Sequence, residues 1–152
     1  MTLEKIKIEL YNQCVDFVDA RINNSLFAIK SAQESANTEV KSSAGDKHET
    51  GRSMAQLETE KNAIQLAESN KLKHVIGLIN PEVVHRRVEL GALVMTNIGQ
   101  YYISVSVGKM IVNKTVYFGV SAVSPIGQAF LNHKKGDEII FNGRKFLLKD
   151  VV

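Results

Sequence analysis

The run Ser124-Pro-Ile-Gly-Gln-Ala-Phe-Leu131, followed by Lys134-Lys-Gly-Asp-Glu138, decides the fold of this chain. Its proline and first glycine end a preceding strand, and Ala129–Leu131 supplies one short apolar helical turn. Gly136-Asp137 is a turn signal, after which residues 138–141 begin a new strand. The run therefore predicts a strand, a short helix, a turn and a further strand.

The chain changes composition at residues 77–81, Gly-Leu-Ile-Asn-Pro. Upstream lie only two of the ten glycines and neither proline, whereas seven of the ten aromatic residues lie downstream. Glycine, aromatic and β-branched residues are typical of strands and turns, and their scarcity is typical of helix. We therefore predict a helical domain over residues 1–76, a linker over 77–81 and a small β-rich domain over 82–152.

Apolar residues in the first half form two helical stripes, separated by a polar stretch that we predict as a tip near residues 42–51. Neither stripe is apolar all round, so we expect the two to cover each other in an antiparallel helical hairpin. Polar residues interrupt both stripes, which predicts a hairpin of modest stability. The first stripe is Leu3, Ile6, Leu10, Phe17, Ala20 and Phe27, and the second is Met54, Leu57, Ile64, Val75 and Leu78.

The second half is typical of a compact sheet with about five strands. Asn142-Gly143 tolerates the positive φ angles of a type I′ turn, so the segments on either side should pair as an antiparallel hairpin. Together with the helical half, this predicts an α+β fold. The expected strands are residues 92–96, 100–107, 115–121, 138–141 and 145–150. The first two, joined by a turn at Asn97-Ile98-Gly99, should form another hairpin.

The composition is that of a globular protein, with 152 residues of which 44% are hydrophobic and 23% charged. No run approaches the ~20 apolar residues of a membrane span, and the N-terminus lacks the apolar region of a secretory signal. Cys14 is the only cysteine, which excludes an internal disulfide and fits a reducing compartment. We therefore expect a cytoplasmic protein with no membrane partner.

The basic excess lies in the C-terminal half of the chain. Residues 1–80 carry 10 Lys and Arg against 11 Asp and Glu, a net charge of −1, whereas the remainder carries 9 against 5, a net charge of +4. Arg86-Arg87 and Lys134-Lys135 are the basic pairs that we expect to meet a partner, either an acidic protein surface or RNA. The alternative is an ordinary solvated surface. Contact with either partner predicts salt-sensitive association.

Asp46 and Glu49 are the candidate catalytic and metal-binding pair. Two carboxylates three residues apart can converge where the backbone is helical or tightly turned. Hard cations such as Mg²⁺ take carboxylate oxygens, with water and phosphate as further ligands. The alternative is a solvated polar loop whose acids keep it soluble or cap the following helix.

The other reactive residues do not form a site of their own in the sequence. The four histidines lack metal-ligand spacing, and Cys14 has no base near it in the sequence. The glycines near residue 45 lack the Lys-Ser/Thr ending of a phosphate-binding loop. We therefore expect no cofactor bound by the chain alone.

Three stretches resemble the bacterial Gre transcript-cleavage factors (GreA/GreB). They are Gly45-Asp-Lys-His-Glu49 between the helical stripes, Val88–Val94, and residues 120–127 with Lys135-Gly-Asp-Glu138. The resemblance implies an N-terminal antiparallel coiled coil and a C-terminal domain of FKBP-like fold, with a small antiparallel β-sheet and one short helix.

The same resemblance implies a transcription elongation factor that binds RNA polymerase. The hairpin would enter the secondary channel, where Asp46 and Glu49 would help to hold the second Mg²⁺ of the polymerase and so stimulate cleavage of backtracked RNA. The chain itself would then be no enzyme, and its Mg²⁺ would be shared with the polymerase. Contact with the polymerase or nascent RNA would fall to Arg86, Arg87, Ser124, Pro125, Ile126, Lys134 and Lys135.

The tip departs from the family pattern, which leaves other functions open. Thr50-Gly51 follows the second acid where the family continues into Asn and another acidic–aromatic pair, and Lys47-His48 places positive character between the acids. A factor that occupies the channel without stimulating cleavage is the first alternative, and a coiled-coil interaction protein unrelated to polymerase is the second. Self-association through the helical seam is not predicted but stays open. Trp is absent and nothing marks an aromatic pocket, which disfavours a prolyl isomerase or other free-standing enzyme.

Overall fold

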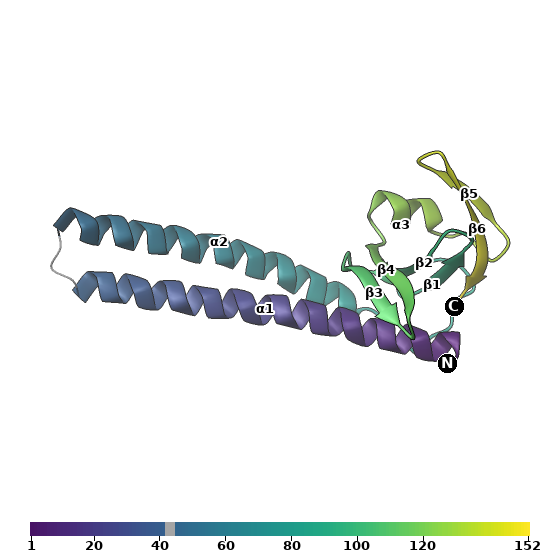
Figure 1. The fold of residues 1–152 in the computed structure, drawn as a ribbon, viewed down its shortest axis with the longest axis horizontal. Coiled ribbons are helices and arrows are strands. Elements are labelled where there is room, and N and C mark those ends of the chain that lie inside the picture. The colour runs from purple at the N-terminus through teal and green to yellow at the C-terminus, as the bar shows by residue number, and fades with distance from the viewer. Residues whose placement is uncertain (42–44) are drawn as a thin grey trace. The chain divides into compact units, whose positions relative to one another are not determined.

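The computed structural model describes residues 1–41 and 45–152, and within these it describes only the backbone of 38–41 and 45–49. Two long helices, α1 (Leu3–Lys41) and α2 (Gly45–Gly77), precede a six-stranded sheet and one short helix, α3 (Pro125–Phe130) (Figure 1). The α+β class predicted from the sequence is therefore confirmed. The strands are β1 (Leu93–Thr96), β2 (Gln100–Ser104), β3 (Gly108–Val112), β4 (Thr115–Ser121), β5 (Glu138–Phe141) and β6 (Arg144–Val151).

The chain divides into two compact units. The first, called the sheet unit here, comprises Met1–Phe17 and His74–Val152, and the second, the hairpin unit, comprises Val18–Lys73. The start of α1 and the end of α2 thus pack with the strands rather than with the rest of the hairpin. The domain bounds drawn from composition, 1–76 and 82–152, stay a prediction about which segments fold independently. Within the described residues, neither long helix combines the length and apolarity that crossing a bilayer requires.

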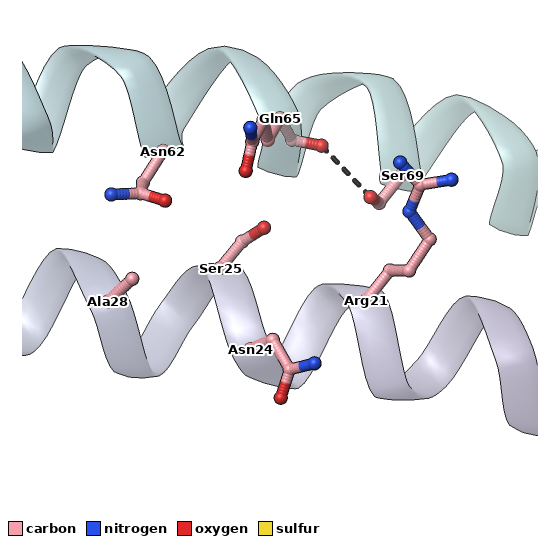
Figure 2. A pocket seen from close by; sticks show the side chains of 7 residues that line it. All are labelled: Arg21, Asn24, Ser25, Ala28, Asn62, Gln65 and Ser69. Carbon is pink, nitrogen blue, oxygen red and sulfur yellow. Dashed lines mark hydrogen bonds between the residues drawn. The ribbon is translucent and has the colours of Figure 1, made fainter.

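The two helices of the hairpin unit lie side by side and run antiparallel. Arg21 lies across from Ser69, and Ala28 lies across from Asn62 (Figure 2). An exposed ion pair of 2.6 Å joins Asp19 and Lys73.

The predicted apolar seam of the hairpin is wrong in detail. Phe27 is 72% exposed and Ile64 is 62% exposed, and Met54, Leu57 and Leu78 are exposed as well. The buried positions recur every seven residues instead and carry small or polar side chains beside aliphatic ones. They are Val18, Ser25 and Ala32 on α1, and Asn62, Ser69 and Ile76 on α2.

The strand order in the sheet is β3-β4-β2-β1-β6-β5. All neighbours are antiparallel except β2 and β4, whose Tyr101 and Phe118 are opposite each other in a parallel pair. The sheet is therefore mixed, where a wholly antiparallel one was predicted. The parallel pairing arises because the strand inserted between β2 and β4 in sequence, β3, lies outside them at the sheet edge.

Two predicted hairpins are present, and a third was missed. β1 pairs with β2, and β5 pairs with β6 around Asn142-Gly143, whose φ angles of 50° and 74° are those of a type I′ turn. β3 and β4 join through a turn of the same kind at Asn113-Lys114, with φ angles of 50° and 66°. Because the second turn position is lysine rather than glycine, residues 113–114 carry no strong turn signal, and β3 was not predicted.

The main core lies between one face of the sheet and α3. Val94, Ile103, Phe130, Phe146 and Leu148 belong to one buried cluster, with Ile126 of α3 packed against it. Four aromatic rings meet there, and the Phe130 and Phe146 centroids lie 5.2 Å apart in an edge-to-face arrangement. The other two rings are Tyr101 and Phe118.

The part of α1 that belongs to the sheet unit contacts the strands and the segment before them. The Sγ atom of Cys14 lies 3.4 Å from Ser104 Oγ and 3.9 Å from Met110 Sδ, and the cysteine is fully buried. Burial raises the pKa of this thiol, and the contact with Ser104 opposes that shift only in part. Lys7, also buried, donates from Nζ to the carbonyl of Val83, and burial lowers the pKa of its ammonium group.

Helix α3 begins earlier than predicted. Pro125 occupies its first turn, and Ser124 is the N-cap, with its Oγ accepting a hydrogen bond from Gly127 N at 3.2 Å. The same Oγ donates to the carbonyl of Ser121 at 2.6 Å, which links the cap to the end of β4. Gly127 therefore lies inside the helix, where its missing side chain allows a close approach, and does not act as a breaker.

Candidate functional site

The predicted acidic tip coincides with the connection between the two long helices. α1 ends at Lys41 and α2 begins at Gly45, so the backbone of Asp46 and Glu49 lies in the first turns of α2. Residues separated by three on a helix lie on one face. The side chains of these two acids, and of Lys47 and His48 between them, lie outside the described part of the chain, as do residues 42–44 altogether. The metal-binding role of the acids therefore stays a prediction.

The two basic pairs, far apart in sequence, are brought together by the backbone of the sheet unit. Arg87 and Lys134 form an isolated antiparallel bridge. Next to it, on the Val88 side, Val88 N donates to His133 O and Asn132 N donates to Val88 O, both at 2.8 Å. Two exposed basic pairs thus lie at neighbouring backbone positions, and the four residues are called the basic bridge below: Arg86, Arg87, Lys134 and Lys135.

A turn closed by Asp137 holds the second basic pair in position. The carboxylate of Asp137 accepts a hydrogen bond from the backbone N–H of Lys134 at 3.0 Å and lies 3.1 Å from His133 Nδ1. The backbone hydrogen bond, followed by the histidine contact, lowers the pKa of this carboxyl group. Gly136, with a φ of +94°, allows the tight bend between them. The ordered turn fixes the backbone that carries the lysines.

The three predicted partner-binding residues at the start of α3 have different surroundings. Ser124 is engaged as the helix cap, and Ile126 is half-buried against the core. Pro125 is the exposed one of the three. A partner at this end of α3 would therefore meet the proline ring first, and substitution of Ser124 would disturb the fold as well as any contact.

A polar cavity of about 340 Å³ lies between the helices of the hairpin unit (Figure 2). Ser69 Oγ donates to the carbonyl of Gln65 at 2.9 Å, and Asn62 Nδ2 donates to the carbonyl of Glu58 at 2.8 Å. Both hydrogen bonds run within α2 and satisfy the polar side chains of Asn62 and Ser69 that face the cavity. The lining residues are Arg21, Asn24, Ser25 and Ala28 of α1, and Asn62, Gln65 and Ser69 of α2.

The sequence reasoning did not predict this cavity or the spacing that produces it. The signal was present as a seven-residue repeat of small or polar residues, Asn62 and Ser69 on one helix and Ser25 and Ala32 on the other. Because larger apolar residues lie beside that repeat, the prediction assigned the buried face of each helix to them instead. Among the described residues, no three His, Cys, Asp or Glu side chains gather as a metal-ligand set.

The comparison with solved structures gives a structural likeness. No protein-family model matches the chain, and no curated protein matches it. Among solved structures, the chain is similar to the crystal structure of GreA factor homolog 1 (Gfh1) of Thermus thermophilus, at 15% identity and a TM-score of 0.35. The match covers 93% of this chain and 94% of that chain, so it spans both the helical hairpin and the sheet. A likeness at this identity and TM-score does not by itself assign a function.

Proposed function

We propose that this chain is a Gre-type transcription factor that binds RNA polymerase and places the tip of its helical hairpin in the secondary channel. The observation that carries the proposal is the coincidence of the Gly45-Asp-Lys-His-Glu49 run with the start of α2, directly after the connection from α1. A long helical hairpin with two acids at the connection is the arrangement that the activity requires.

The proposed chemistry is the placement of Mg²⁺ in the active site of the polymerase. Asp46 and Glu49 lie on helical backbone at a spacing of three, which supports their convergence on one cation. One or two carboxylates suffice for Mg²⁺ when water and phosphate oxygens complete its shell. A second metal ion stabilises the attacking and leaving oxygens of phosphodiester hydrolysis. The reaction would thus take place in the polymerase, and this chain would have no active site of its own.

The proposed docking surface is the basic bridge together with Pro125. The bridge joins two exposed basic pairs of the sheet unit through Arg87 and Lys134, which supports contact with an acidic protein surface. The hairpin tip would remain available for the channel, because docking would use only the sheet unit.

Cleavage of labelled RNA in a backtracked elongation complex tests the proposal. Wild-type protein with its cognate polymerase and Mg²⁺ should shorten the transcript, and Asp46→Ala/Glu49→Ala should lower the rate at least tenfold without weakening binding. Glu60→Ala/Glu68→Ala is the matched control, since it removes two exposed acids of α2 away from the tip. Equal loss in both double variants would contradict a specific role of the tip.

Lys47 and His48 favour a second candidate, a factor that occupies the channel without stimulating cleavage. Positive character between the acids weakens the attraction for a cation. Protein that binds the polymerase and alters elongation but leaves backtracked RNA intact would establish this alternative. Protein that does not bind polymerase would instead point to a coiled-coil protein with another partner.

A further inference from the structure

We propose that the open edge of β5 is a docking strand for an extended, acidic segment of a partner protein. The sheet has two edge strands, β3 and β5. The β3 edge is contacted by α1, because Gln13 Nε2 donates to the carbonyl of Ile111 at 3.0 Å. No described residue makes a comparable contact with the outer edge of β5. An uncovered strand edge is a template for pairing with another chain.

The register identifies which backbone groups of β5 face outward. The two-residue turn at Asn142-Gly143 makes Phe141 and Arg144 a hydrogen-bonded pair, and bonding alternates along the strands from there. The N–H and C=O groups of Glu138 and Ile140 therefore point away from β6. The same rule applied to the Asn113-Lys114 turn places Ile111 outward on β3, which is where Gln13 reaches its carbonyl.

The side chains of β5 suit a strand-shaped partner. Ile139 is buried under the sheet, whereas its neighbour Ile140 is 76% exposed. Ile140 leaves the middle of this edge strand without the charge that commonly blocks such pairing, and the charge at its start, Glu138, is paired with Lys145. A pairing segment would cover this side chain and would bond the outward groups of Glu138 and Ile140.

The positive charges at both ends of β5 favour an acidic partner segment. Lys134 and Lys135 of the basic bridge precede the strand, and Arg144 and Lys145 follow it. Glu138 is engaged by Lys145 at 3.1 Å, and the turn engages Asp137, so the two acids of the segment are already partnered. A second copy of this chain would bring like charges together, whereas an acidic strand would meet cations at both of its ends.

The proposal rests on the proposed function only for the identity of the partner, RNA polymerase. Ile140→Pro is the diagnostic substitution, since it removes an outward N–H that the β5–β6 ladder does not use. We expect it to weaken binding to cognate core polymerase at least tenfold with an unchanged circular dichroism spectrum. Ile140→Thr keeps the N–H. It should raise the logarithm of the dissociation constant by less than half as much as Ile140→Pro does. Lys109→Pro, at an outward position of β3, should bind as wild type does.

A peptide titration separates failure of this proposal from failure of the proposed function. The probes are ten-residue peptides of alternating Asp and Val, or of alternating Lys and Val, added to isotope-labelled protein. The acidic peptide should shift the amide resonances of Glu138 and Ile140, and the basic peptide should not. If wild-type protein fails to bind polymerase, the proposed function fails, and the peptide result alone decides the role of β5.

Four outcomes would overturn the docking strand. In the first, Ile140→Pro leaves polymerase binding unchanged. In the second, the protein does not bind polymerase and the acidic peptide does not shift the amide resonances, and in the third the basic peptide shifts them equally. In the fourth, the wild-type protein is a dimer that Ile140→Pro converts to a monomer. The last outcome would assign the edge to a second copy of the chain. A single-stranded RNA of ten nucleotides serves as a further probe, and larger shifts of the same amides with RNA would also overturn the proposal.

Discussion

Gly127 is the residue on which the junction between β4 and α3 depends. A Cβ atom at this position would lie 2.0 Å from the carbonyl oxygen of Ser121, a backbone atom that cannot rotate away. The glycine is therefore required by a close approach and not by a positive φ angle. Its position inside α3, against the end of β4, explains why a helix-disfavouring residue is found there.

We predict that Gly127→Ala lowers the free energy of unfolding by about 3 kcal/mol, because β4 and α3 must move apart to admit the methyl group. Urea denaturation measures this change. Gln128→Ala, an exposed position of the same helix, is the control and should stay within about 0.5 kcal/mol of wild type. Equal stability of the two variants would show that the junction yields without cost.

The backbone conformation of a residue could be predicted from the sequence where its side chain favours one conformation. Asn142-Gly143 was identified as a type I′ turn because asparagine and glycine tolerate positive φ angles. Asn113-Lys114 adopts the same turn, and its lysine, at a φ of 66°, gives no such signal. There the pairing of β3 with β4 imposes the conformation, and sequence alone does not reveal a tertiary constraint of that kind.

At the scale of elements, the turn from Lys134 to Asp137 couples the basic bridge to pH. The pKa of Asp137 is lowered in the folded protein, so at acid pH the folded state binds fewer protons at this group than the unfolded state does. Its stabilising contribution is therefore present above the ordinary carboxyl pKa of about 4 and is lost as the pH falls below it. We predict that Asp137→Asn reduces the dependence of the melting temperature on pH between about 5 and 3. An unchanged pH profile in this variant would contradict the role of the carboxylate.

The hairpin unit offers a prediction about its polar cavity. Asn62→Leu should raise the melting temperature of the helical signal by a few degrees, because the new side chain extends apolar contact into the cavity beside Ala28. The lost amide bonds go to the Glu58 carbonyl and carboxylate, and the carboxylate remains accessible to water. Asn62→Ala is the control, since it removes the amide without filling the space and should not stabilise. A lower melting temperature for Asn62→Leu would show that the polar seam itself stabilises the hairpin.

The existence of both long helices could be predicted from the sequence, but the face by which they meet could not. Phe27 and Ile64 have the spacing of a buried stripe and are exposed, whereas Ser25 and Ser69 are buried. Hydrophobic periodicity assumes that the largest apolar residues are buried, and that assumption fails where small polar residues occupy the seam. The exposed apolar residues are consistent with a hairpin that has a second surface available to a partner.

At the scale of the whole molecule, the basic bridge predicts a salt-dependent association. Arg87→Glu/Lys134→Glu should weaken binding to RNA polymerase and flatten its dependence on salt, because two attractive charges become repulsive. Lys109→Glu/Lys114→Glu carries the same change in net charge to the β3 hairpin and is the matched control. Binding isotherms at several salt concentrations measure both effects. Equal weakening by the two double variants would indicate a response to net charge and not to the bridge.

More of the architecture than of the candidate sites could be predicted from the sequence. A helical hairpin followed by a small sheet with one short helix follows from composition and local signals, and the structure has this order. The joining of Arg87 to Lys134, 47 positions apart, depends on how β-strands meet in space and could not be derived from either pair alone. The acidic tip was located between the helices, while its metal chemistry stays a prediction.

The sheet order has a consequence for how the chain matures on the ribosome. β1 pairs with β6, through Val94 and Val151, so the sheet cannot close until its last strand has been synthesised. Met1–Phe17 belong to that same compact unit and are synthesised before any of the strands. Residues 18–73 contact one another locally and can assemble meanwhile. The apolar surface of Leu10 and Val88 therefore stays unburied while the remaining strands are synthesised, and hydrophobic surface exposed in this way is prone to aggregation.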